Sequence, residues 1–374
     1  MKQAKTILST YTADVSGVCS ALFELGGMTV MHDASGCNST YNTHDEPRWY
    51  DHDSLVFISA LSEMEAIMGD DSKLVSDLID TANKLKPNFV AVAGTPIPML
   101  TGCDLQAIAF QVEEATGIPA FGFNTNGMRS YVLGAGEALS RWGERFCDRA
   151  AVRKTGRMNI LGATPLDFSV VGITESMKAA AEKAGWKVIS TWAMGSTPEE
   201  MKRAGEAEVN LVVSGVGLPA ARMLQKLFGT PYVVGTPCGE AFNAKLFSAL
   251  SESAADGKSR TVFADYIPAA DAELLILGES VTARSLASAI YLTYGKEVKV
   301  ICTLETEAGI LSANDLHYAE EEDIFSALKG AKGVIADPMF KPAVPEGCTF
   351  YALPHEGCSG RIWRKQIPDL VDRL

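Results

Sequence analysis

The sequence predicts an α/β protein of three doubly wound domains, each with a mainly parallel sheet flanked by helices, around a central cleft. Two observations predict this fold. Apolar, β-rich segments alternate with amphipathic helical stretches three times along the 374 residues, as in parallel sheets covered by helices. The connections between these segments are short and contain Gly or Pro. We therefore expect Rossmann-like domains at residues 1–153, 154–258 and 259–374.

The first domain is expected to contain at least three strands and two helices. Its strands are short apolar runs, and its helices carry apolar residues at helical spacing. The strands are expected at 55–61, 88–94 and 118–124, and the helices at 71–85 and 104–117. Asp70, Asp71 and Lys73, at the start of the first of these helices, are expected to serve turn and capping roles.

The second and third domains repeat the same alternation. In the second, strand-like runs at 158–164, 207–215 and 230–237 enclose helical stretches that begin near 176 and 218 and end in Gly, a residue typical of helix C-termini. In the third, strands are expected at 272–278, 297–305, 333–338 and 348–354, with helices at 280–295 and 321–329. Loops after such strands are where ligands bind in doubly wound sheets.

Charge and composition exclude several classes of protein. The net charge of −13 disfavours binding to nucleic acid or to an anionic membrane, because phosphates would be repelled. No stretch of ~18 uncharged apolar residues occurs and the first residues lack an export signal, so we expect a soluble, cytoplasmic protein. The eight cysteines are then free thiols, available for packing, catalysis or metal binding.

Two cysteines lie in the most informative segment, GVCSALFELGGMTVMHDASGC. Cys19 and Cys37 flank an expected short helix and turn, and both are expected before or within loops. Thiolates select iron–sulfur clusters or zinc, but a closed site needs about four ligands. A second copy of the chain could supply the rest across a twofold axis. The alternative is that both are buried thiols that act as small hydrophobic side chains.

Four segments together resemble the first domain of nitrogenase component 1 proteins. They are GVCSALFELGGMTVMHDASGC, FISALSEMEAIMGDDSKL, AVAGTPIPMLTGCDL and GIPAFGFNTNG, in that order. The resemblance implies that Cys19 and Cys37 bind an iron–sulfur cluster at the interface of two homologous subunits. Thr95 stands where the family has a third cysteine, and Cys103, further along the same loop, is a substitute candidate. The missing cysteine favours a [4Fe-4S] cluster over a larger eight-iron cluster.

The resemblance also implies candidate residues in the cleft. His32 matches a cleft-lining position of the family, and Glu63 lies in a segment that borders the cleft there, so both are candidates for catalysis. His355 and Cys358 lie in the third-domain region from which the family's cofactor-binding histidine comes, so they are candidates to hold a second metal cofactor or cap a substrate pocket, and His355 is a third candidate for catalysis. In the second domain, the segment VVSGVGLP lacks the cysteine that holds the metal cofactor in catalytic nitrogenase subunits.

Cys238 is a further metal candidate on its own local pattern. It stands at the end of an expected strand, just before a helix. The positive end of a helix dipole lowers the pKa of a nearby thiol and favours the thiolate. Packing is an equally good interpretation of this residue.

These observations predict the electron-accepting, iron–sulfur subunit of a nitrogenase-like oxidoreductase that reduces a small molecule in the interdomain cleft. No GxxxxGK[ST] phosphate loop is present, so ATP hydrolysis must occur on a separate iron-protein-type reductase. The subunit would form a homodimer or a heterodimer with a homologue. The alternatives are a metallocluster assembly scaffold without turnover and a protein that only binds a metal or metallophore.

Overall fold

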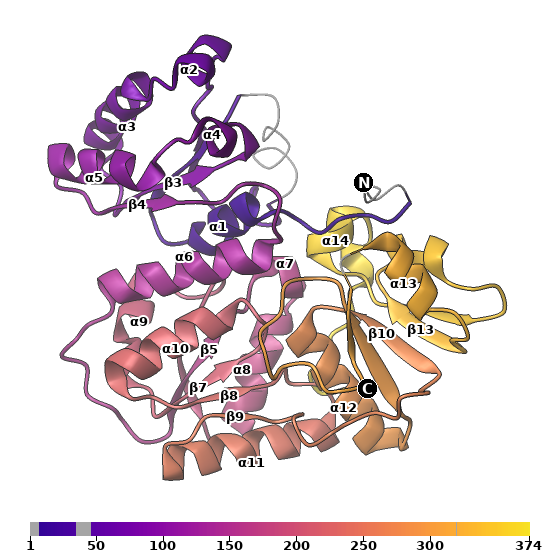
Figure 1. Cartoon of the computed structure of the whole chain (residues 1–374). Helices are drawn as coiled ribbons and strands as arrows, with labels where there is room; N and C mark the ends of the chain where they lie inside the picture. The colour runs from indigo at the N-terminus through magenta and orange to yellow at the C-terminus, as the bar shows by residue number, and fades with distance from the viewer. Residues whose placement is uncertain (1–6, 35–45, 319) are drawn as a thin grey trace.

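The structure confirms the predicted α/β fold. The computed structural model describes residues 7–34, 46–318 and 320–374, which form three parallel sheets flanked by helices (Figure 1). Every strand pairing within these sheets is parallel. Each sheet therefore places the carboxyl ends of its strands along one edge, where the loops that follow the strands gather.

The first sheet has the strand order β2-β1-β3-β4. Its strands are β1 (Met28–His32), β2 (Leu55–Ile58), β3 (Val90–Gly94) and β4 (Ala120–Phe123). The sequence analysis assigned no strand to β1, although it lies in the middle of the sheet. All five β1 residues are buried, so the run shows no alternation of apolar and polar residues by which to identify a strand.

Six helices accompany this sheet: α1 (Asp14–Leu22), α2 (Glu63–Met68), α3 (Ser72–Leu85), α4 (Pro96–Thr101), α5 (Leu105–Thr116) and α6 (Tyr131–Phe146). α1 and α6 cross in close contact because glycines lie at the crossing. A Cβ at Gly134 would stand 2.0 Å from the Asp14 carbonyl oxygen, and one at Gly17 would stand 2.4 Å from that of Tyr131. The expectation that Cys19 lies in or before a loop is wrong, because it is buried within α1.

The second sheet has the order β6-β5-β7-β8-β9. Its strands are β5 (Arg157–Leu161), β6 (Lys187–Thr191), β7 (Val209–Val212), β8 (Tyr232–Val234) and β9 (Arg260–Thr261). Its helices are α7 (Pro165–Phe168), α8 (Ile173–Lys183), α9 (Pro198–Lys202), α10 (Gly217–Phe228) and α11 (Glu240–Asp256), with a 3-10 turn η2 (Arg203–Glu206). β9 follows residue 258, and the domain boundaries placed at 153 and 258 stay predictions.

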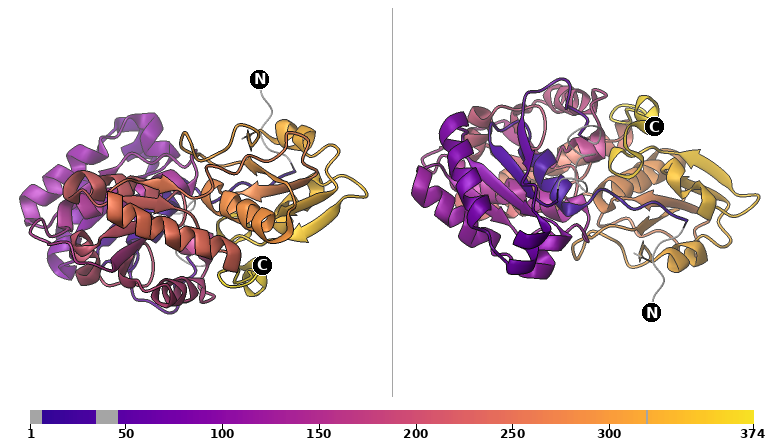
Figure 2. Two further views of the ribbon diagram at one scale, coloured as in Figure 1. Left: turned by 90° about the horizontal axis from the view of Figure 1, so that it is seen from below. Right: turned by 90° about the horizontal axis from the view of Figure 1, so that it is seen from above.

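The third sheet has the order β12-β11-β10-β13-β14. Its strands are β10 (Leu274–Gly278), β11 (Val298–Cys302), β12 (Leu316–His317), β13 (Gly333–Ala336) and β14 (Thr349–Ala352). Its helices are α12 (Ser280–Tyr294), α13 (Glu321–Ala327) and α14 (Glu356–Ser359), with 3-10 turns η3 (Pro338–Ala343), η4 (Gly360–Ile362) and η5 (Arg364–Gln366). In both views of Figure 2 this part stands beside the other two.

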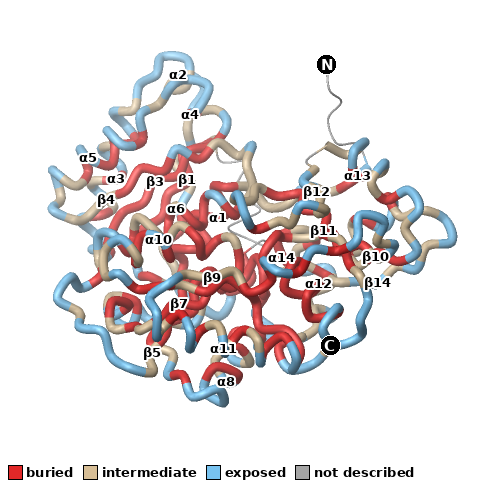
Figure 3. Tube along the Cα trace, turned by 60° about the horizontal axis from the view of Figure 1, so that its bottom comes forward, coloured by how far each residue is buried: buried red, intermediate tan, exposed pale blue. Residues whose placement is uncertain are grey.

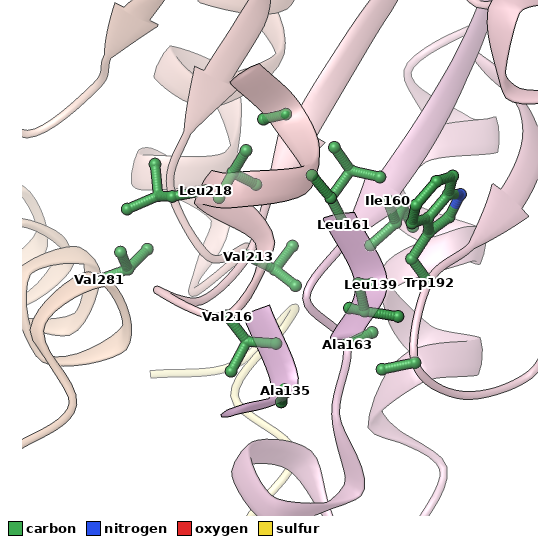
Figure 4. Packing of buried hydrophobic residues seen from close by; sticks show 14 of the residues in the cluster. Ala135, Leu139, Ile160, Leu161, Ala163, Trp192, Val213, Val216, Leu218 and Val281 are labelled. Atoms are coloured by element: carbon green, nitrogen blue, oxygen red, sulfur yellow. The ribbon is translucent and has the colours of Figure 1, made fainter. Parts of the chain in front are cut away.

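A continuous apolar core joins the three parts. The inner strands of the three sheets are mostly buried, while β14, much of α2 and parts of the outer helices are exposed (Figure 3). Figure 4 shows Leu139 of α6 packed near Ile160 and Leu161 of β5, with Val281 of α12 on the opposite side of the group. None of the helices in the described part of the chain has the length and apolar character needed to cross a bilayer.

The two end segments of the described chain cross between these parts. Thr12, ahead of α1, donates a backbone hydrogen bond of 2.7 Å to the Gly357 carbonyl oxygen in α14. Near the other end, the Leu370 carbonyl oxygen accepts a 2.9 Å hydrogen bond from the backbone N–H of Gly239, beside α11. Both segments border the junction of the second and third sheets, which contains the cavity described next.

Candidate functional site

A cavity of about 110 Å³ lies between the carboxyl ends of the second and third sheets. Five of its lining residues follow five different strands: Asp167 after β5, Cys238 after β8, Glu279 after β10, Asp337 after β13 and His355 after β14. In doubly wound sheets this edge is where ligands bind. The cavity combines these polar groups with an otherwise largely apolar lining, as small-molecule sites do.

His355 is held at this cavity by its backbone and by its ring faces. It is the N-cap residue of α14, and its backbone N–H donates a 2.7 Å hydrogen bond to Asp337 Oδ2. Its ring packs edge-on to Tyr11, with 5.4 Å between ring centroids. Nε2 lies 3.3 Å from Asp167 Oδ1, but within the described residues neither buried ring nitrogen makes a hydrogen bond of good geometry. The ring is fixed while both nitrogens are available to a ligand.

Asp167 stands opposite His355 with a fully buried side chain. Tyr131 of α6 donates its hydroxyl proton to Oδ1, whereas Oδ2 has no hydrogen-bond partner among the described atoms. Two residues on, Ser169 adopts a positive φ of 54°, and its hydroxyl donates a 2.6 Å hydrogen bond to Glu356 of α14. This contact attaches the end of α7, which carries Asp167, to the helix that follows His355.

Glu279 is a buried carboxyl group at the start of α12. It accepts hydrogen bonds from the backbone N–H groups of Val281 and Thr282, at 3.0 and 2.9 Å, and of Gly215, at 3.1 Å. Burial raises the pKa of Glu279, and the charge of nearby Asp167 raises it further. Gly215 belongs to the segment without the expected cofactor cysteine, so a carboxyl group, not a thiol, occupies this side of the cavity.

The prediction that the helix dipole lowers the pKa of the Cys238 thiol is wrong. Burial raises the pKa of this thiol to about 12, since loss of solvation outweighs the helix dipole. The residue precedes Gly239, the N-cap of α11, and its backbone N–H donates to Asn243 Oδ1 at 2.8 Å. Cys358 lies on α14, half-buried against the core of the third sheet. Metal binding by either cysteine stays a prediction.

A second group of polar residues lies at the edge of the first sheet. His32 ends β1, Asp71 precedes α3 and Cys103 follows α4, and ligand atoms from all three lie within 4.8 Å of one another. The sequence analysis named His32 and Cys103 for different roles and assigned Asp71 to capping. The capping role is wrong: the Asp71 side chain accepts no cap hydrogen bond, whereas Asp70 accepts one from the Ser72 N–H at 3.0 Å.

Cys19 and Glu63 belong to neither group. Cys19 is fully buried on α1, where burial and the charge of Glu46 raise the pKa of its thiol well above the usual range. Cys37 lies outside the described residues, so its pairing with Cys19 stays a prediction. Glu63 is the exposed first residue of α2 and does not line the cavity between the second and third sheets.

Sequence reasoning missed four acidic residues of these two groups. Asp167 and Glu279 follow segments that the sequence already predicted as strands, and Asp337 lies near the end of a third, just after the observed β13. Their position after strands was the available signal, since the carboxyl ends of parallel strands carry the ligand-binding loops. Asp71 gave no comparable signal, because an aspartate before a helix is most often a cap.

Known proteins resemble this chain in sequence. Residues 16–307 match the sequence profile of the family described as nitrogenase component 1 type oxidoreductase. A nitrogenase iron-molybdenum cofactor biosynthesis protein, NifE, of Methanosarcina barkeri is 28% identical over 191 residues, which cover 47% of this chain and 40% of that protein. The nitrogenase molybdenum-iron protein alpha chain of Clostridium pasteurianum is 24% identical over 182 residues, covering 48% and 33%.

Two further comparisons extend the likeness. A subunit of the light-independent protochlorophyllide reductase of a Synechococcus species is 24% identical over 211 residues, covering 53% of this chain and 41% of that protein. The matches thus span less than half the length of these three curated relatives. A solved structure titled "Nitrogenase Cp1 at pH 6.5" superposes with a TM-score of 0.69 at 16% identity, covering 99% of this chain and 94% of that one. That similarity shows the shared fold.

Proposed function

Because the chain belongs to the nitrogenase component 1 type oxidoreductase family, we propose that it is the iron–sulfur subunit of a two-component reductase. In this proposal the subunit accepts electrons from a separate ATP-dependent reductase and reduces a small molecule held between the second and third sheets. The observation that carries the proposal is His355, a half-buried histidine fixed at the cavity, whose two ring nitrogens have no hydrogen-bond partner among the described residues.

The cluster is proposed to bind through Cys19 and Cys37, with the same or homologous residues from a second subunit. Cys19 suits this role in one respect: its thiol is enclosed and lies near the carboxylate of Glu46. These surroundings disfavour a bare thiolate, and the positive charge of bound iron would reverse that preference. When bound, a cluster of this kind supplies electrons at low potential, and the [4Fe-4S] type is proposed because Thr95 replaces a third cysteine.

Substrate binding is proposed at the cavity, with His355 as the residue that contacts the substrate. Asp167 Oδ1 lies 3.3 Å from its Nε2, so a histidine and a carboxylate, two groups that can exchange protons with a substrate that gains electrons, stand side by side at the cavity. Asp337 positions His355 through the 2.7 Å backbone hydrogen bond. Glu279, whose pKa is raised, can retain a second proton at the same wall.

The volume of the cavity limits the ligand in this arrangement of the sheets. About 110 Å³ is well below the ~300–1,000 Å³ of pockets for drug-sized ligands. The cavity therefore has room for a molecule of few non-hydrogen atoms. A larger substrate would require the second and third sheets to move apart.

Two partners are proposed. The first is a homologous subunit or a second copy of the chain, because exposed apolar side chains gather on α2 and α4: Met64, Ile67, Met68, Met99 and Leu100. Exposed patches of this kind mark interaction sites, and both helices lie at the edge of the first sheet (Figure 1). The second is an ATP-hydrolysing, iron-protein-type reductase, because this sequence lacks a phosphate-binding loop.

A metallocluster assembly scaffold is the second candidate function. Two observations favour it: a relative at 28% identity is named as a cofactor biosynthesis protein, and the segment around Gly215 offers no cysteine to retain a cofactor permanently. A scaffold would transfer its metal cargo once to an acceptor protein. A reductase would consume electrons and ATP repeatedly with its partner reductase.

The test is anaerobic iron and sulfide analysis with EPR of the dithionite-reduced protein. Wild type is compared with Cys19→Ala and Cys37→Ala, and Cys147→Ala serves as the matched control because Cys147 is also a buried thiol, at the end of α6. We expect iron, sulfide and the EPR signal to be lost in the first two variants and retained in the control.

The outcomes separate the proposals. Iron-free wild-type protein would overturn the iron–sulfur assignment. If iron were lost in Cys147→Ala but retained in Cys19→Ala and Cys37→Ala, the cluster ligands would have to be assigned to other residues. If the cluster is present, sustained ATP-dependent electron consumption with an iron-protein-type reductase supports the reductase. A single transfer of iron to an acceptor without turnover supports the scaffold.

A further inference from the structure

We propose that His32, Asp71 and Cys103 form a mononuclear Zn²⁺ site, separate from the proposed interface cluster and from the cavity. The three residues come from the loops and ends that follow β1, β2 and β3, so they meet at the carboxyl edge of the first sheet. They offer one nitrogen, one oxygen and one sulfur ligand atom within 4.8 Å of one another. Zn²⁺ accepts all three ligand types.

The distances between the ligand atoms are close to those of a tetrahedral zinc site. Zn–S bonds of ~2.3 Å and Zn–O bonds of ~2.0 Å place sulfur and oxygen ~3.5 Å apart at the tetrahedral angle. Cys103 Sγ lies 3.5 and 3.6 Å from the two carboxylate oxygens of Asp71. His32 Nε2 lies 3.9 Å from Asp71 Oδ1, so a shift of about half an ångström would bring these two groups to the N···O separation of a tetrahedral zinc site.

The orientation of the His32 ring leaves the correct nitrogen for the metal. Ser59 Oγ donates to the Asp33 carbonyl oxygen at 3.3 Å and accepts the Asp33 N–H at 3.1 Å. With the Ser59 proton directed at the Asp33 carbonyl oxygen, His32 Nδ1, 2.8 Å from Ser59 Oγ, is the donor of that contact. Histidine ligands of zinc use their second nitrogen in this way to fix the ring, which leaves the Nε2 lone pair directed at Asp71.

Without a cation this arrangement places two acceptors face to face. His32 Nε2 and Asp71 Oδ1 face each other at 3.9 Å, which is too far apart for a hydrogen bond between them. A metal ion would bind both lone pairs. It would also take the place of the Cys103 proton, since metal binding releases protons from its ligands.

A nucleophilic role for Cys103 does not fit. An activated cysteine lies beside a cationic side chain that stabilises its thiolate, whereas the Cys103 thiol lies 3.5 Å from the Asp71 carboxylate. Its nearest polar neighbour is a carboxylate, not a base that could take up its proton. The Asp71 side chain is 32% exposed and that of His32 is 4% exposed. His32 is therefore enclosed by protein, whereas Asp71 is accessible to solvent. The three residues supply three ligands, and a water molecule would take the fourth position on the zinc ion, as in catalytic zinc sites.

The test is titration of the full-length, anaerobically purified chain with Co²⁺, which gives thiolate-to-cobalt charge-transfer and tetrahedral visible bands, followed by displacement with Zn²⁺. We expect one equivalent to bind. Cys103→Ser should abolish the charge-transfer band, and Asp71→Asn should weaken Zn²⁺ binding by at least about tenfold. Asp70→Asn and Cys348→Ser, the matched controls, should bind like wild type, because neither residue belongs to the group.

The same titration in Cys19→Ala separates this site from the cluster. A charge-transfer band that persists in Cys19→Ala and disappears in Cys103→Ser supports the site even if no cluster exists. A band that survives in Cys103→Ser, or wild-type protein that binds no Co²⁺, overturns it. Because Asp71→Asn changes a partly exposed side chain, it tests the site even if Cys103→Ser fails to fold.

Discussion

Buried polar side chains without partners mark the candidate site at the scale of single residues. Most buried polar atoms in folded proteins make hydrogen bonds, and those that do not carry a cost in stability. Asp167 Oδ2 and both ring nitrogens of His355 are such atoms, and they line one cavity. Such unmet hydrogen-bonding capacity is typical of a site prepared for a ligand.

The stability cost of the two His355 ring nitrogens can be measured with a substitution that keeps the shape of the side chain. His355→Phe keeps the ring contact with Tyr11 and removes two unsatisfied nitrogens, so the free energy of unfolding should rise by about 1 kcal/mol. The measurement is urea unfolding at pH 7.5 in the absence of ligands. A clear destabilisation would show that the ring makes a stabilising hydrogen bond or ion pair in the free protein.

His317→Phe is the matched control for this change. The exposed His317 ring has a partner, because its Nε2 lies 2.8 Å from the Leu304 carbonyl oxygen. Removing that hydrogen bond should lower the free energy of unfolding by about 0.5–1.5 kcal/mol. The two histidines should therefore respond with opposite signs.

Among the elements, α6 links the first sheet to the second. It packs on α1 through glycines on one side and on α10 on the other, and its first residue, Tyr131, reaches Asp167 at the cavity. Helices approach this closely only where no Cβ intervenes. The geometry of α6 therefore fixes both the position of Cys19 on α1 and one wall of the cavity.

Gly134→Ala tests this crossing. A Cβ there would stand 2.0 Å from the Asp14 carbonyl oxygen, so the helices would have to separate, at a cost of about 1–3 kcal/mol. Leu133→Ala, at a neighbouring position that is 39% exposed, should change stability much less. Thermal unfolding compares the two, and equal effects would argue against the close helix crossing.

The η2 turn is attached to β5 by one carboxylate. Glu206 contacts Lys154 at 2.9 Å, Arg157 at 2.6 Å and Arg203 at 3.0 Å. Hydrogen bonds from Arg203 and Lys154 lower the pKa of Glu206 from 4.5 to about 2. A lowered carboxyl pKa stabilises the folded state at pH above 4.5, and this contribution is lost as the pH falls toward 2.

Glu206→Gln should therefore lower stability in a pH-dependent way. At pH 7 the free energy of unfolding should fall by about 1–3 kcal/mol, and the difference from wild type should shrink between pH 4.5 and pH 3. Glu199→Gln, which removes a 74% exposed carboxylate paired with Lys202, should have little effect at either pH. A difference for Glu206→Gln that does not vary with pH would contradict this account.

At the scale of the whole molecule, the sites proposed for metal binding and for substrate binding lie in separate parts of the fold. The predicted cluster ligand Cys19, the proposed zinc site and the exposed apolar side chains of α2 and α4 all belong to the first sheet or its helices. The cavity lies where the second and third sheets meet. A subunit interface at α2 and α4 would leave that junction uncovered for substrate.

Charged substitutions on α2 and α4 test this interface. Ile67 and Leu100 are 71% and 78% exposed, so Ile67→Asp and Leu100→Asp should leave folding intact and weaken association. Phe110→Asp on α5, at a 68% exposed position, is the control. Sedimentation velocity should show the two-chain species reduced to single chains in the first two variants only. A monomeric wild type would indicate that the partner is a homologous subunit.

The sequence by itself determined the α/β class, the three successive parallel sheets and the family, because periodicity and segment order are local properties of the chain. It also identified His32, Cys103, His355 and Cys238 one at a time. Only the tertiary structure showed that His32 and Cys103 meet around Asp71, and that His355 faces Asp167. These groupings depend on which loops converge at the carboxyl edge of each sheet, and strand order and packing between sheets, not spacing along the chain, decide that convergence.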